Sequence, residues 1–403
     1  MKKAILFLEQ QSWLSGAQRV LENVLDSIIP EFEPLVAFPS PGPFSAKLQA
    51  RNIETLLMPL GAYRSGRKSH SEMLAFSARS LLSGLKLASV VRRRNVGLIY
   101  INGPRCLPAG VLAACLTGRP SLFHLHLTLT RKPEISLVAH LARYVSKIVT
   151  CSIASAQPLL DADPQLAGKI HLFHQPVLAC GRPPHLFAKA AGPPTRFTLG
   201  MVGRITEHKG QGRLLSAVGM LRPDLQEKTH MVFVGAPAPG DPSDVVYAHK
   251  LQDAAVQLHL HDRIFWAGYQ TDPVAFYGSM DMLVQPSSVQ SGEAMPLAIL
   301  EALREGVPVL ASRTGGIPEI IQPEVNGLLV PPGDDGALAG ALQRFLVDGP
   351  LRARLQSGAR STLLDQFSVE RFQSKIHGLI RELSSCNPPG EGGSQRRELT
   401  AWK

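Results

Sequence analysis

The chain has 403 residues, 44% of them hydrophobic and 18% charged, and a formal net charge of +10. This length predicts two or three domains with room for a large core. No continuous apolar run approaches the roughly 18 residues of a membrane-spanning helix, which argues against an integral membrane protein. The excess positive charge indicates a polyanionic partner, which could be nucleic acid, an anionic lipid or an acidic glycan, and charge alone does not choose among them.

The start of the chain and its cysteines indicate a cytoplasmic protein. The apolar run at residues 4–8 is too short for the core of a signal peptide and is followed at once by the polar residues 9–11, so it predicts a first buried strand. The cysteines are odd in number and widely spaced, at positions 106, 115, 151, 180 and 386. They indicate reduced thiols and no disulfide framework or zinc site.

Short apolar runs alternate with helical patterns over the first 180 residues. A helix is expected from the turn S-G-A-Q-R-V at 15–20 to about Ile29. Strands are expected at 5–8, 35–38, 55–58, 98–102, 121–126 and 148–151. Such alternation predicts right-handed crossovers and a parallel sheet. Ligands bind at the carboxyl ends of such strands, where the turn with Gly16, the segment Asn102-Gly103-Pro104, and His124 and His126 all fall.

A second alternating series begins at Phe197, after a Pro/Gly-rich segment at 181–195 that reads as a linker. Strands are expected at 197–202, 231–234, 264–267, 282–285 and 309–311. The first of them runs into G-R-I-T-E-H-K-G at 203–210. There, Arg204 and Lys209 flank a glycine-bordered loop before a helix, an arrangement that can neutralise a diphosphate.

The most informative stretch is 285–305, Q-P-S-S-V-Q-S-G-E-A-M-P-L-A-I-L-E-A-L-R-E. Its strand stops at Pro286, a loop follows, and Pro296 is expected at the first position of a helix. The first turn of a helix has unpaired N–H groups that bind anions. Glu293 just before it and Glu301 within it would accept hydrogen bonds from hydroxyl groups. An anion that also carries hydroxyls, such as a sugar on a nucleoside diphosphate, fits both features.

The spacing Glu293-x7-Glu301, between P-S at 286–287 and G-V-P-V at 306–309, resembles the signature of GT4-type retaining glycosyltransferases. G-R-x4-K-G at 203–210 is similar to the family's pyrophosphate clamp, and G-G-I-P-E at 315–319 to its G-G-x-x-E turn. The resemblance is strong over about 197–365 and diffuse over the first 180 residues. It implies an α/β GT-B fold, in which two Rossmann-like doubly wound domains face each other across a cleft.

The resemblance assigns domains and roles. Residues 1–180 would bind the acceptor, 196–365 the nucleotide sugar, 366–385 would form a helix returning to the first domain, and 386–403 a disordered tail. Arg204, Lys209 and the helix N-terminus after Gly292 would hold the diphosphate, Glu301 the ribose, and Glu293 and His126 the sugar. The residues expected in catalysis are His126, Glu293, Arg204 and Lys209; those expected to bind the donor are Gly16, Gly203, Arg204, Lys209, Gly235, Glu293, Ala294, Met295, Leu297 and Glu301.

The implied reaction is transfer of a sugar from a UDP- or GDP-sugar to a glycan or lipid-linked acceptor, with retained configuration, in cell-surface polysaccharide or glycolipid synthesis. The strand ends lack an Asp-x-Asp pair, so no metal or other cofactor is expected. Two departures concern the first domain. Ser15 and Gln18 replace a glycine and a glutamate of the family's first turn, and H-Q-P-V at 174–177 replaces its N-G-[VI]-D segment.

Three alternatives differ in class. A sugar-nucleotide epimerase of the same fold would lack the acid pair. A catalytically silent, nucleotide-sugar-binding partner subunit would be free to lose Glu293, Glu301, Arg204, Lys209 and His126, all of which are present. A Rossmann dehydrogenase would carry G-x-G-x-x-G after its first strand, which is missing here.

A helix expected at 72–94 suggests where the positive charge acts. Leu74, Leu81, Leu85 and Ala88 would face the sheet. Arg79, Lys86 and Arg93 recur every seven residues on another side, flanked by Phe76, Leu82 and Val90, with Arg64, Arg67 and Lys68 upstream. Outward basic and apolar groups together suit an anionic membrane surface. The alternative is a solvated helix with stray apolar residues. We therefore expect a cytoplasmic protein that binds a membrane peripherally through 64–94 and does not bind nucleic acid.

Overall fold

A computed structural model describes residues 2–61, 69–177, 196–361 and 366–385. It contains a 7-stranded and a 6-stranded sheet, each assembled from one half of the chain. The predicted linker at 181–195 and tail at 386–403 lie outside the described residues, as do Arg64, Arg67 and Lys68. Cys106, Cys115 and Cys151, the cysteines within the described ranges, are free thiols.

The first sheet is parallel throughout, in the order β3-β2-β1-β4-β5-β6-β7. Its strands are β1 (Lys3–Glu9), β2 (Phe32–Phe38), β3 (Glu54–Leu57), β4 (Val96–Asn102), β5 (Ser121–Leu125), β6 (Lys147–Thr150) and β7 (Ile170–Leu172). Side chains alternate along β1: Ile5 and Phe7 enter one core cluster, and Leu6 and Leu8 enter another. Both faces of the sheet are therefore covered.

The second sheet, also parallel, has the order β10-β9-β8-β11-β12-β13. Its strands are β8 (Phe197–Val202), β9 (Thr229–Val234), β10 (Ile264–Gly268), β11 (Met282–Gln285), β12 (Val309–Ser312) and β13 (Gly327–Val330). The predicted strands match those observed to within a few residues at each end, and the short strands β7 and β13 were missed. The expected GT-B architecture of two doubly wound domains is confirmed.

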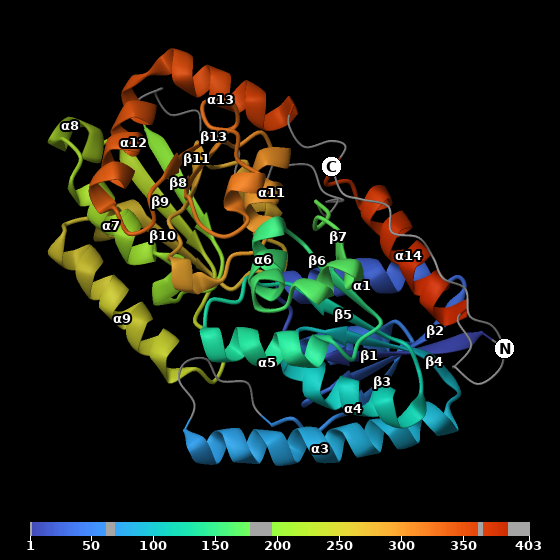
Figure 1. The fold of residues 1–403 in the computed structure, drawn as a ribbon. Helices are drawn as coiled ribbons and strands as arrows, with labels where there is room; N and C mark the ends of the chain where they lie inside the picture. The colour runs from blue at the N-terminus through green and yellow to red at the C-terminus, as the bar shows by residue number, and fades with distance from the viewer. Residues whose placement is uncertain (1, 62–68, 178–195, 362–365, 386–403) are drawn as a thin grey trace.

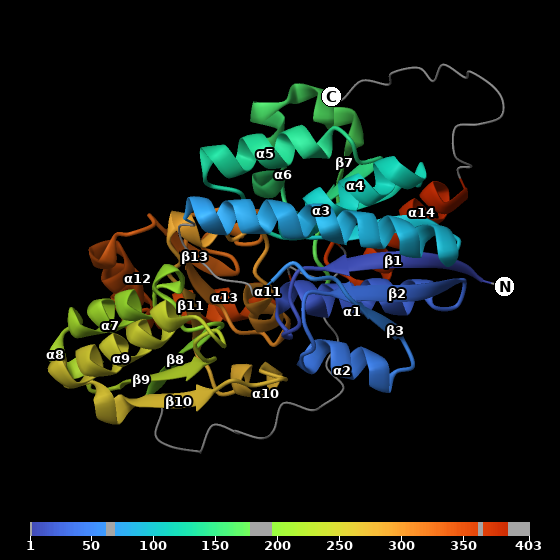
Figure 2. The same ribbon diagram turned by 90° about the horizontal axis from the view of Figure 1, so that it is seen from below.

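The helices lie on both sides of each sheet (Figures 1 and 2). In the first domain they are α1 (Gly16–Ile28), α2 (Pro43–Ala50), α3 (His70–Arg93), α4 (Leu107–Thr117), α5 (Lys132–Ala142) and α6 (Ile153–Ala162). In the second they are α7 (Gln211–Gly219), α8 (Pro223–Gln226), α9 (Pro242–Gln257), α10 (Val274–Tyr277), α11 (Leu297–Arg304), α12 (Asp335–Val347) and α13 (Gly349–Ser361). The last helix, α14 (Val369–Ser385), lies beside α1 of the first domain, and Gln373 Nε2 donates to the Asn23 carbonyl at 3.2 Å.

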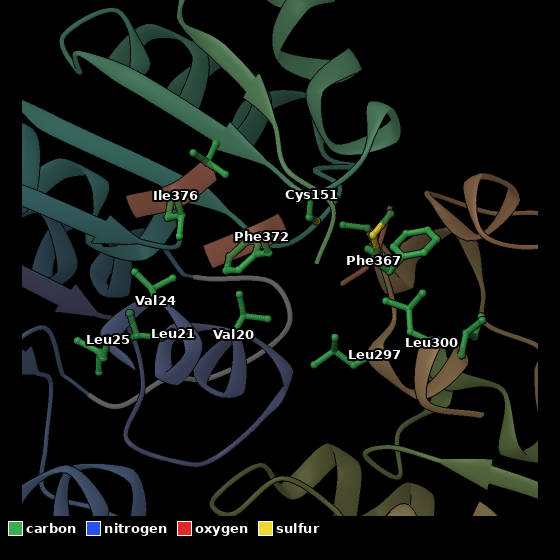
Figure 3. Close-up of a cluster of buried hydrophobic side chains, with 14 of the residues drawn as sticks. Val20, Leu21, Val24, Leu25, Cys151, Leu297, Leu300, Phe367, Phe372 and Ile376 are labelled. Carbon is green, nitrogen blue, oxygen red and sulfur yellow. The ribbon is translucent and has the colours of Figure 1, made fainter. Parts of the chain in front are cut away.

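One hydrophobic cluster joins the two domains. Figure 3 shows Val20 and Val24 of α1 together with Leu297 and Leu300 of α11, and with Phe372 of α14. All of these side chains are less than a tenth exposed. Burial of this apolar surface fixes the approach of α1 to α11, whose N-terminal ends carry residues predicted to bind the donor.

The predicted sheet-facing stripe of α3 is wrong in most of its residues. Of that stripe only Ala88 is buried, whereas Leu74, Leu81 and Leu85 are 72%, 54% and 50% exposed. Phe76 and Val90, expected to face outward, instead pack partly buried against the core. Leu82 is exposed as expected, at 62%.

The physical reason is close packing of α3 on α4. The buried face of α3 carries Ser80, Ser83 and Gly84 as well as Leu87 and Val91. A Cβ built on Gly84 would lie 2.7 Å from a methyl of Leu112 on α4. The face of α3 that contacts α4 is therefore identified by its small residues and not by a stripe of large hydrophobic residues. The first half of α3 runs past the end of α4 (Figure 1), and Leu74 and Leu81 in this half are exposed.

Within the described residues, α3 is also the helix long and apolar enough to cross a membrane by length and composition. Only 39% of its most apolar window is buried in the protein. Because one side packs on α4 and the sheet, we interpret it as a helix of the domain that keeps an exposed apolar face.

Candidate active site

The loop between β11 and α11 places Glu293 where the second domain contacts the first. Gly292 adopts a φ of +63°, and its carbonyl accepts from the backbone N–H of Thr128 in the first domain at 2.9 Å. Glu293 is 7% exposed, and its Oε1 accepts from Lys209 Nζ at 2.5 Å, Ser287 Oγ at 3.0 Å and Gln285 Nε2 at 3.1 Å. Oε2 has no donor at hydrogen-bond distance among the described residues, so it can accept a further hydrogen bond.

The predicted basic pair lies on the loop that faces Glu293. Lys209 ends a short 3-10 helix (Glu207–Lys209), and Gly210 then adopts a φ of +83° before α7 begins. Arg204 follows β8; its Nε lies 3.5 Å from Asp244 Oδ2, and its side chain is 39% exposed. The structure therefore brings Lys209 and Glu293 into direct contact and leaves the Arg204 guanidinium accessible to an anion.

Glycines let these loops touch backbone to backbone. A Cβ on Gly315 would lie 1.7 Å from the Glu293 carbonyl oxygen, and one on Gly235 would lie 1.8 Å from that of Gly203. Gly316 N–H donates to the same Glu293 carbonyl at 2.9 Å. The G-G-I-P-E turn thus fixes the backbone of the loop that carries Glu293, and any side chain at Gly315 would displace that loop. A side chain at Gly235 would instead displace the loop of Gly203 and Arg204.

Glu301 is buried between the domains, with its side chain 2% exposed. Its Oε1 accepts from Arg19 Nη1 of α1 at 2.5 Å, and its Oε2 accepts from the Tyr277 hydroxyl at 2.9 Å. Burial raises the pKa of Tyr277 well above its ordinary value, and the Glu301 charge adds to this effect. Tyr277 thus stays a donor, and the carboxylate has a cation and a hydroxyl as partners.

The remaining predicted donor-binding residues lie at the ends of α1 and α11. Gly16 opens α1, and a Cβ there would lie 3.5 Å from Leu297. Leu297 begins α11, so Pro296 is its N-cap and not, as predicted, its first helical residue. Ala294 and Met295 are buried, and Met295 Sδ accepts from the Gln175 backbone N–H at 3.4 Å.

His126 directly follows β5 and faces this loop through Gln175. Its Nε2 lies 2.7 Å from Asn102 Oδ1, and its Nδ1 lies 3.3 Å from Gln175 Nε2. Its ring lies against that of His124, with centroids 3.8 Å apart and planes tilted by 36°. Burial lowers the pKa of His126 to about 3, so the imidazole is neutral near pH 7. It can orient a hydroxyl, but the imidazolium form that would act as a general acid is not populated at that pH.

Asn102 in turn contacts a buried acid, Glu9. The β1–β4 register pairs Glu9 with Asn102, and Asn102 Nδ2 donates to Glu9 Oε2 at 2.5 Å. Glu9 Oε1 accepts from Gln18 Nε2 at 2.8 Å and from the Gln11 backbone N–H at 3.1 Å. Burial raises the pKa of Glu9 to about 7, although the hydrogen bonds from Asn102, Gln18 and Gln11 oppose this rise.

Several site residues escaped the sequence analysis, namely Glu9, Arg19, Gln175 and Tyr277. Arg19 was quoted as part of the first turn, but its partner is 282 positions away. Gln175 lies in the segment that departs from the family pattern, which was a signal that this loop is built differently. Glu319, quoted within the G-G-x-x-E turn, accepts from the Ile153 and Ala154 N–H groups at the start of α6, both at 3.0 Å, and joins the domains there.

In the part of the chain that the structure describes, no group of three or more His, Cys, Asp or Glu side chains is placed to hold a metal ion. The acids of the cleft instead contact lysine, arginine and hydroxyl groups.

The raised pKa of Glu9 predicts a specific pH dependence of stability. The folded chain binds this proton more tightly than the unfolded chain, so the contribution is fully present below about pH 4.5 and is lost as pH rises through about 7. A pKa raised from 4.5 to about 7 corresponds to roughly 3 kcal/mol of unfolding free energy, of which about 2.5 kcal/mol is lost between pH 5 and pH 8. Denaturant unfolding of the wild type and Glu9→Gln between pH 5 and pH 8 should show the wild type losing that amount relative to the variant. If the free energy of unfolding changes with pH by the same amount in the wild type and in Glu9→Gln, the raised pKa of Glu9 would be contradicted.

Comparison with known proteins shows which family the chain is similar to. Residues 184–362 match the family model described as Glycosyl transferases group 1. The lipopolysaccharide core biosynthesis glycosyltransferase LpsE of Rhizobium meliloti is 32% identical over 169 residues, which are 42% of this chain and 45% of that protein. A D-inositol 3-phosphate glycosyltransferase of Saccharomonospora viridis is 33% identical over 195 residues, 47% of this chain and 44% of its own. The chain thus spans a little under half the length of these relatives.

Among solved structures, Anabaena Alr3699/HepE, crystallised in complex with UDP-glucose, superposes with a TM-score of 0.78 at 22% identity. The superposition covers 94% of this chain and 99% of that one, so the likeness extends over both domains. It shows a shared fold. The family match over 184–362, which covers the second domain, and the two facing sheets together support a GT4-type group 1 glycosyltransferase.

Proposed function

We propose that the chain transfers a sugar from a nucleoside diphosphate sugar to a glycan or lipid-linked acceptor in lipopolysaccharide or related cell-surface glycan synthesis, with retained anomeric configuration. The observation that carries this proposal is the contact of Lys209 with Glu293, one a cation for a diphosphate and the other an acceptor for a sugar hydroxyl. HepE in complex with UDP-glucose and LpsE in lipopolysaccharide core biosynthesis support the donor and acceptor classes.

The donor would lie across the cleft with its diphosphate at the second domain. Arg204, Lys209 and the first N–H groups of α11 supply positive potential where the leaving diphosphate gains charge. Lys209 would turn from Glu293 Oε1 toward the phosphate, because a diphosphate carries more negative charge than one carboxylate. Ser287 and Gln285 would still hold Glu293 Oε1, at 3.0 and 3.1 Å.

The nucleoside ribose would bind at Glu301. The ribose hydroxyl groups are hydrogen-bond donors, as are Arg19 and Tyr277, which contact Glu301 in this structure. Binding therefore exchanges Arg19 for ribose hydroxyls at Oε1, while Tyr277 stays on Oε2. Arg19 lies on the first turn of α1 beside Gly16, and once displaced it would face the same diphosphate.

The sugar would lie between Glu293 Oε2 and His126. Both are acceptors for hydroxyl groups, and neither is placed as a nucleophile. We propose that the acceptor hydroxyl attacks on the face that the diphosphate leaves, and that a phosphate oxygen takes its proton. The protein then contributes orientation and charge stabilisation, which suffice for large rate effects. No metal or other cofactor enters this scheme.

We also propose that α3 holds the enzyme on an anionic membrane surface, where a lipid-linked acceptor would be found. Met73, Leu74, Leu81, Leu82 and Leu85 are each about half exposed or more. At 3.6 residues per turn, Leu74, Leu81 and Leu85 form one stripe of α3, and Leu82 lies between this stripe and that of Arg79, Lys86 and Arg93. An exposed apolar stripe edged by cations suits lipid headgroups better than water.

The first prediction tests the diphosphate site. Arg204→Ala or Lys209→Ala should weaken UDP or GDP binding by roughly 1.5–3 kcal/mol, the scale of a charge-assisted hydrogen bond, and leave nucleoside binding unchanged. Isothermal titration calorimetry measures both. Arg222→Ala, which removes an exposed arginine paired with Asp224 in the same domain, is the matched control. Equal losses for nucleotide and nucleoside would reject the site.

The second prediction concerns metal. Glycosyl transfer should persist in EDTA, because arginine, lysine and helix N–H groups supply the positive charge that a divalent ion would otherwise provide. Turnover in EDTA-treated enzyme, with and without added Mg²⁺ or Mn²⁺, measures this. Activity that disappears with EDTA and returns with metal would contradict it.

The third prediction concerns the membrane. Sedimentation with phosphatidylglycerol-containing vesicles should be reversed by salt, and it should be reduced both by Arg79, Lys86 and Arg93→Glu and by Leu74 and Leu82→Ser. The control Arg222, Lys228 and Lys250→Glu makes the same charge change on exposed residues of the second domain. Equal binding to phosphatidylcholine vesicles, or equal loss in the control, would favour a soluble acceptor.

A further inference from the structure

We propose that Glu9 is a positioning residue that fixes which nitrogen of His126 carries the proton, so that Nδ1 can accept a hydrogen bond from the donor sugar. It would do so by setting the direction of a chain of hydrogen bonds through Asn102. The proposal rests on the proposed function only for the role of His126, and the tautomer of the imidazole can be measured without turnover.

The direction of the chain follows from which groups can donate. The partners of Glu9 described above are N–H groups, so both of its oxygens accept. Asn102 must therefore turn its amide NH₂ toward Glu9, which leaves its Oδ1, an acceptor, toward His126. An acceptor at 2.7 Å from His126 Nε2 requires the proton on Nε2. His126 Nδ1 then carries no proton, and its lone pair can accept a hydrogen bond.

That lone pair faces the donor-binding loop. Gln175 Nε2 lies 3.3 Å from it, a long contact, and the Gln175 backbone N–H donates to Met295 of the loop before α11. A sugar hydroxyl arriving beside Met295 can take the place of the Gln175 amide. In this tautomer His126 accepts from that hydroxyl; in the other it would repel the hydroxyl proton.

Glu9 also connects His126 to the other side of the site. Gln18 donates to Glu9 and accepts from the Ser15 backbone N–H at 3.1 Å, closing the turn that holds Gly16. One buried carboxylate thus sets the orientation of two amides, one leading to His126 and one to the N-terminus of α1. This gives a reason for a carboxylate that is fully buried and paired with N–H groups of uncharged residues.

Glu9→Gln separates this role from packing, because it keeps the shape. The oxygen of the introduced glutamine would stay toward the two donors at the Oε1 position, Gln18 and Gln11. Its NH₂ group would then face the NH₂ group of Asn102, so two donors would oppose each other. Rotation of the Asn102 amide relieves the clash and turns NH₂ toward His126 Nε2, which must then accept. The proton moves to Nδ1. The double variant Glu9→Gln/Asn102→Asp restores the direction, since the introduced glutamine donates to one oxygen of the introduced aspartate and His126 Nε2–H donates to the other.

The experiment is long-range ¹H–¹⁵N NMR of the full chain at pH 8, with the His126 signals assigned by their loss in His126→Gln, since the chain has 13 histidines. In the wild type, Nδ1 should give a pyridine-type and Nε2 a pyrrole-type shift. Glu9→Gln should exchange the two, and the double variant should exchange them back. Asp163→Asn, a buried acid that is paired with Arg143 and lies outside this chain of hydrogen bonds, should leave both unchanged.

Enzyme kinetics are the second measurement. The kcat/KM for the nucleotide sugar should fall about tenfold or more in Glu9→Gln, the scale of one hydrogen bond, and recover in part in the double variant. A proton on Nδ1 in the wild type, or an unchanged tautomer in Glu9→Gln, would overturn the proposal. If Glu9→Gln does not fold, Asn102→Ala replaces it, and an unchanged tautomer there would be equally decisive. Absence of turnover in the wild type with every nucleotide sugar, beside the expected tautomers, would reject the proposed function and leave the positioning role standing.

Discussion

The structure depends most on one charged contact, that between Glu301 of α11 and Arg19 of α1. Glu301 is 1% exposed, so its carboxylate requires partners that replace water, and one of them comes from the other domain. The pair sits beside the hydrophobic cluster that joins α1, α11 and α14. Apolar burial supplies most of the driving force for that contact, and the ion pair restricts the orientation in which the two helices can meet.

The same constraint connects structure to function. A residue that resemblance assigns to the ribose is used within the protein as a domain contact, and so is Glu293, whose backbone carbonyl accepts from Thr128 Oγ1 of the first domain at 3.3 Å while its carboxylate accepts from Lys209. Each acid is held by cations that a nucleoside diphosphate could compete for. In our proposal, donor binding therefore exchanges protein contacts for ligand contacts across the cleft, and it does not bury any new unpaired charge.

Much of the fold could be predicted because its signals are local. Alternation of apolar runs with helical patterns sufficed for two parallel sheets, and the spacing from Gly203 to Gly210 and from Glu293 to Glu301 located the loops of the second domain. The missed features depend on distance in sequence. Arg19 meets Glu301, Gln175 meets His126 and Glu9 meets Asn102 only after folding. Helix α3 was misjudged because Ser80, Ser83 and Gly84 read as polar or neutral, although close helix packing needs residues of that size.

The most direct test of the central claim is a screen of UDP-, GDP- and ADP-sugars without acceptor, followed by NMR of the released sugar. We predict slow hydrolysis of sugars on one nucleotide, release of the sugar with its anomeric configuration retained, and loss of this activity in Glu301→Ala with the fold intact. Wild-type hydrolysis by Glu301→Ala, or no binding and no hydrolysis of any of these donors by the wild type, would contradict a nucleotide-sugar site in the cleft.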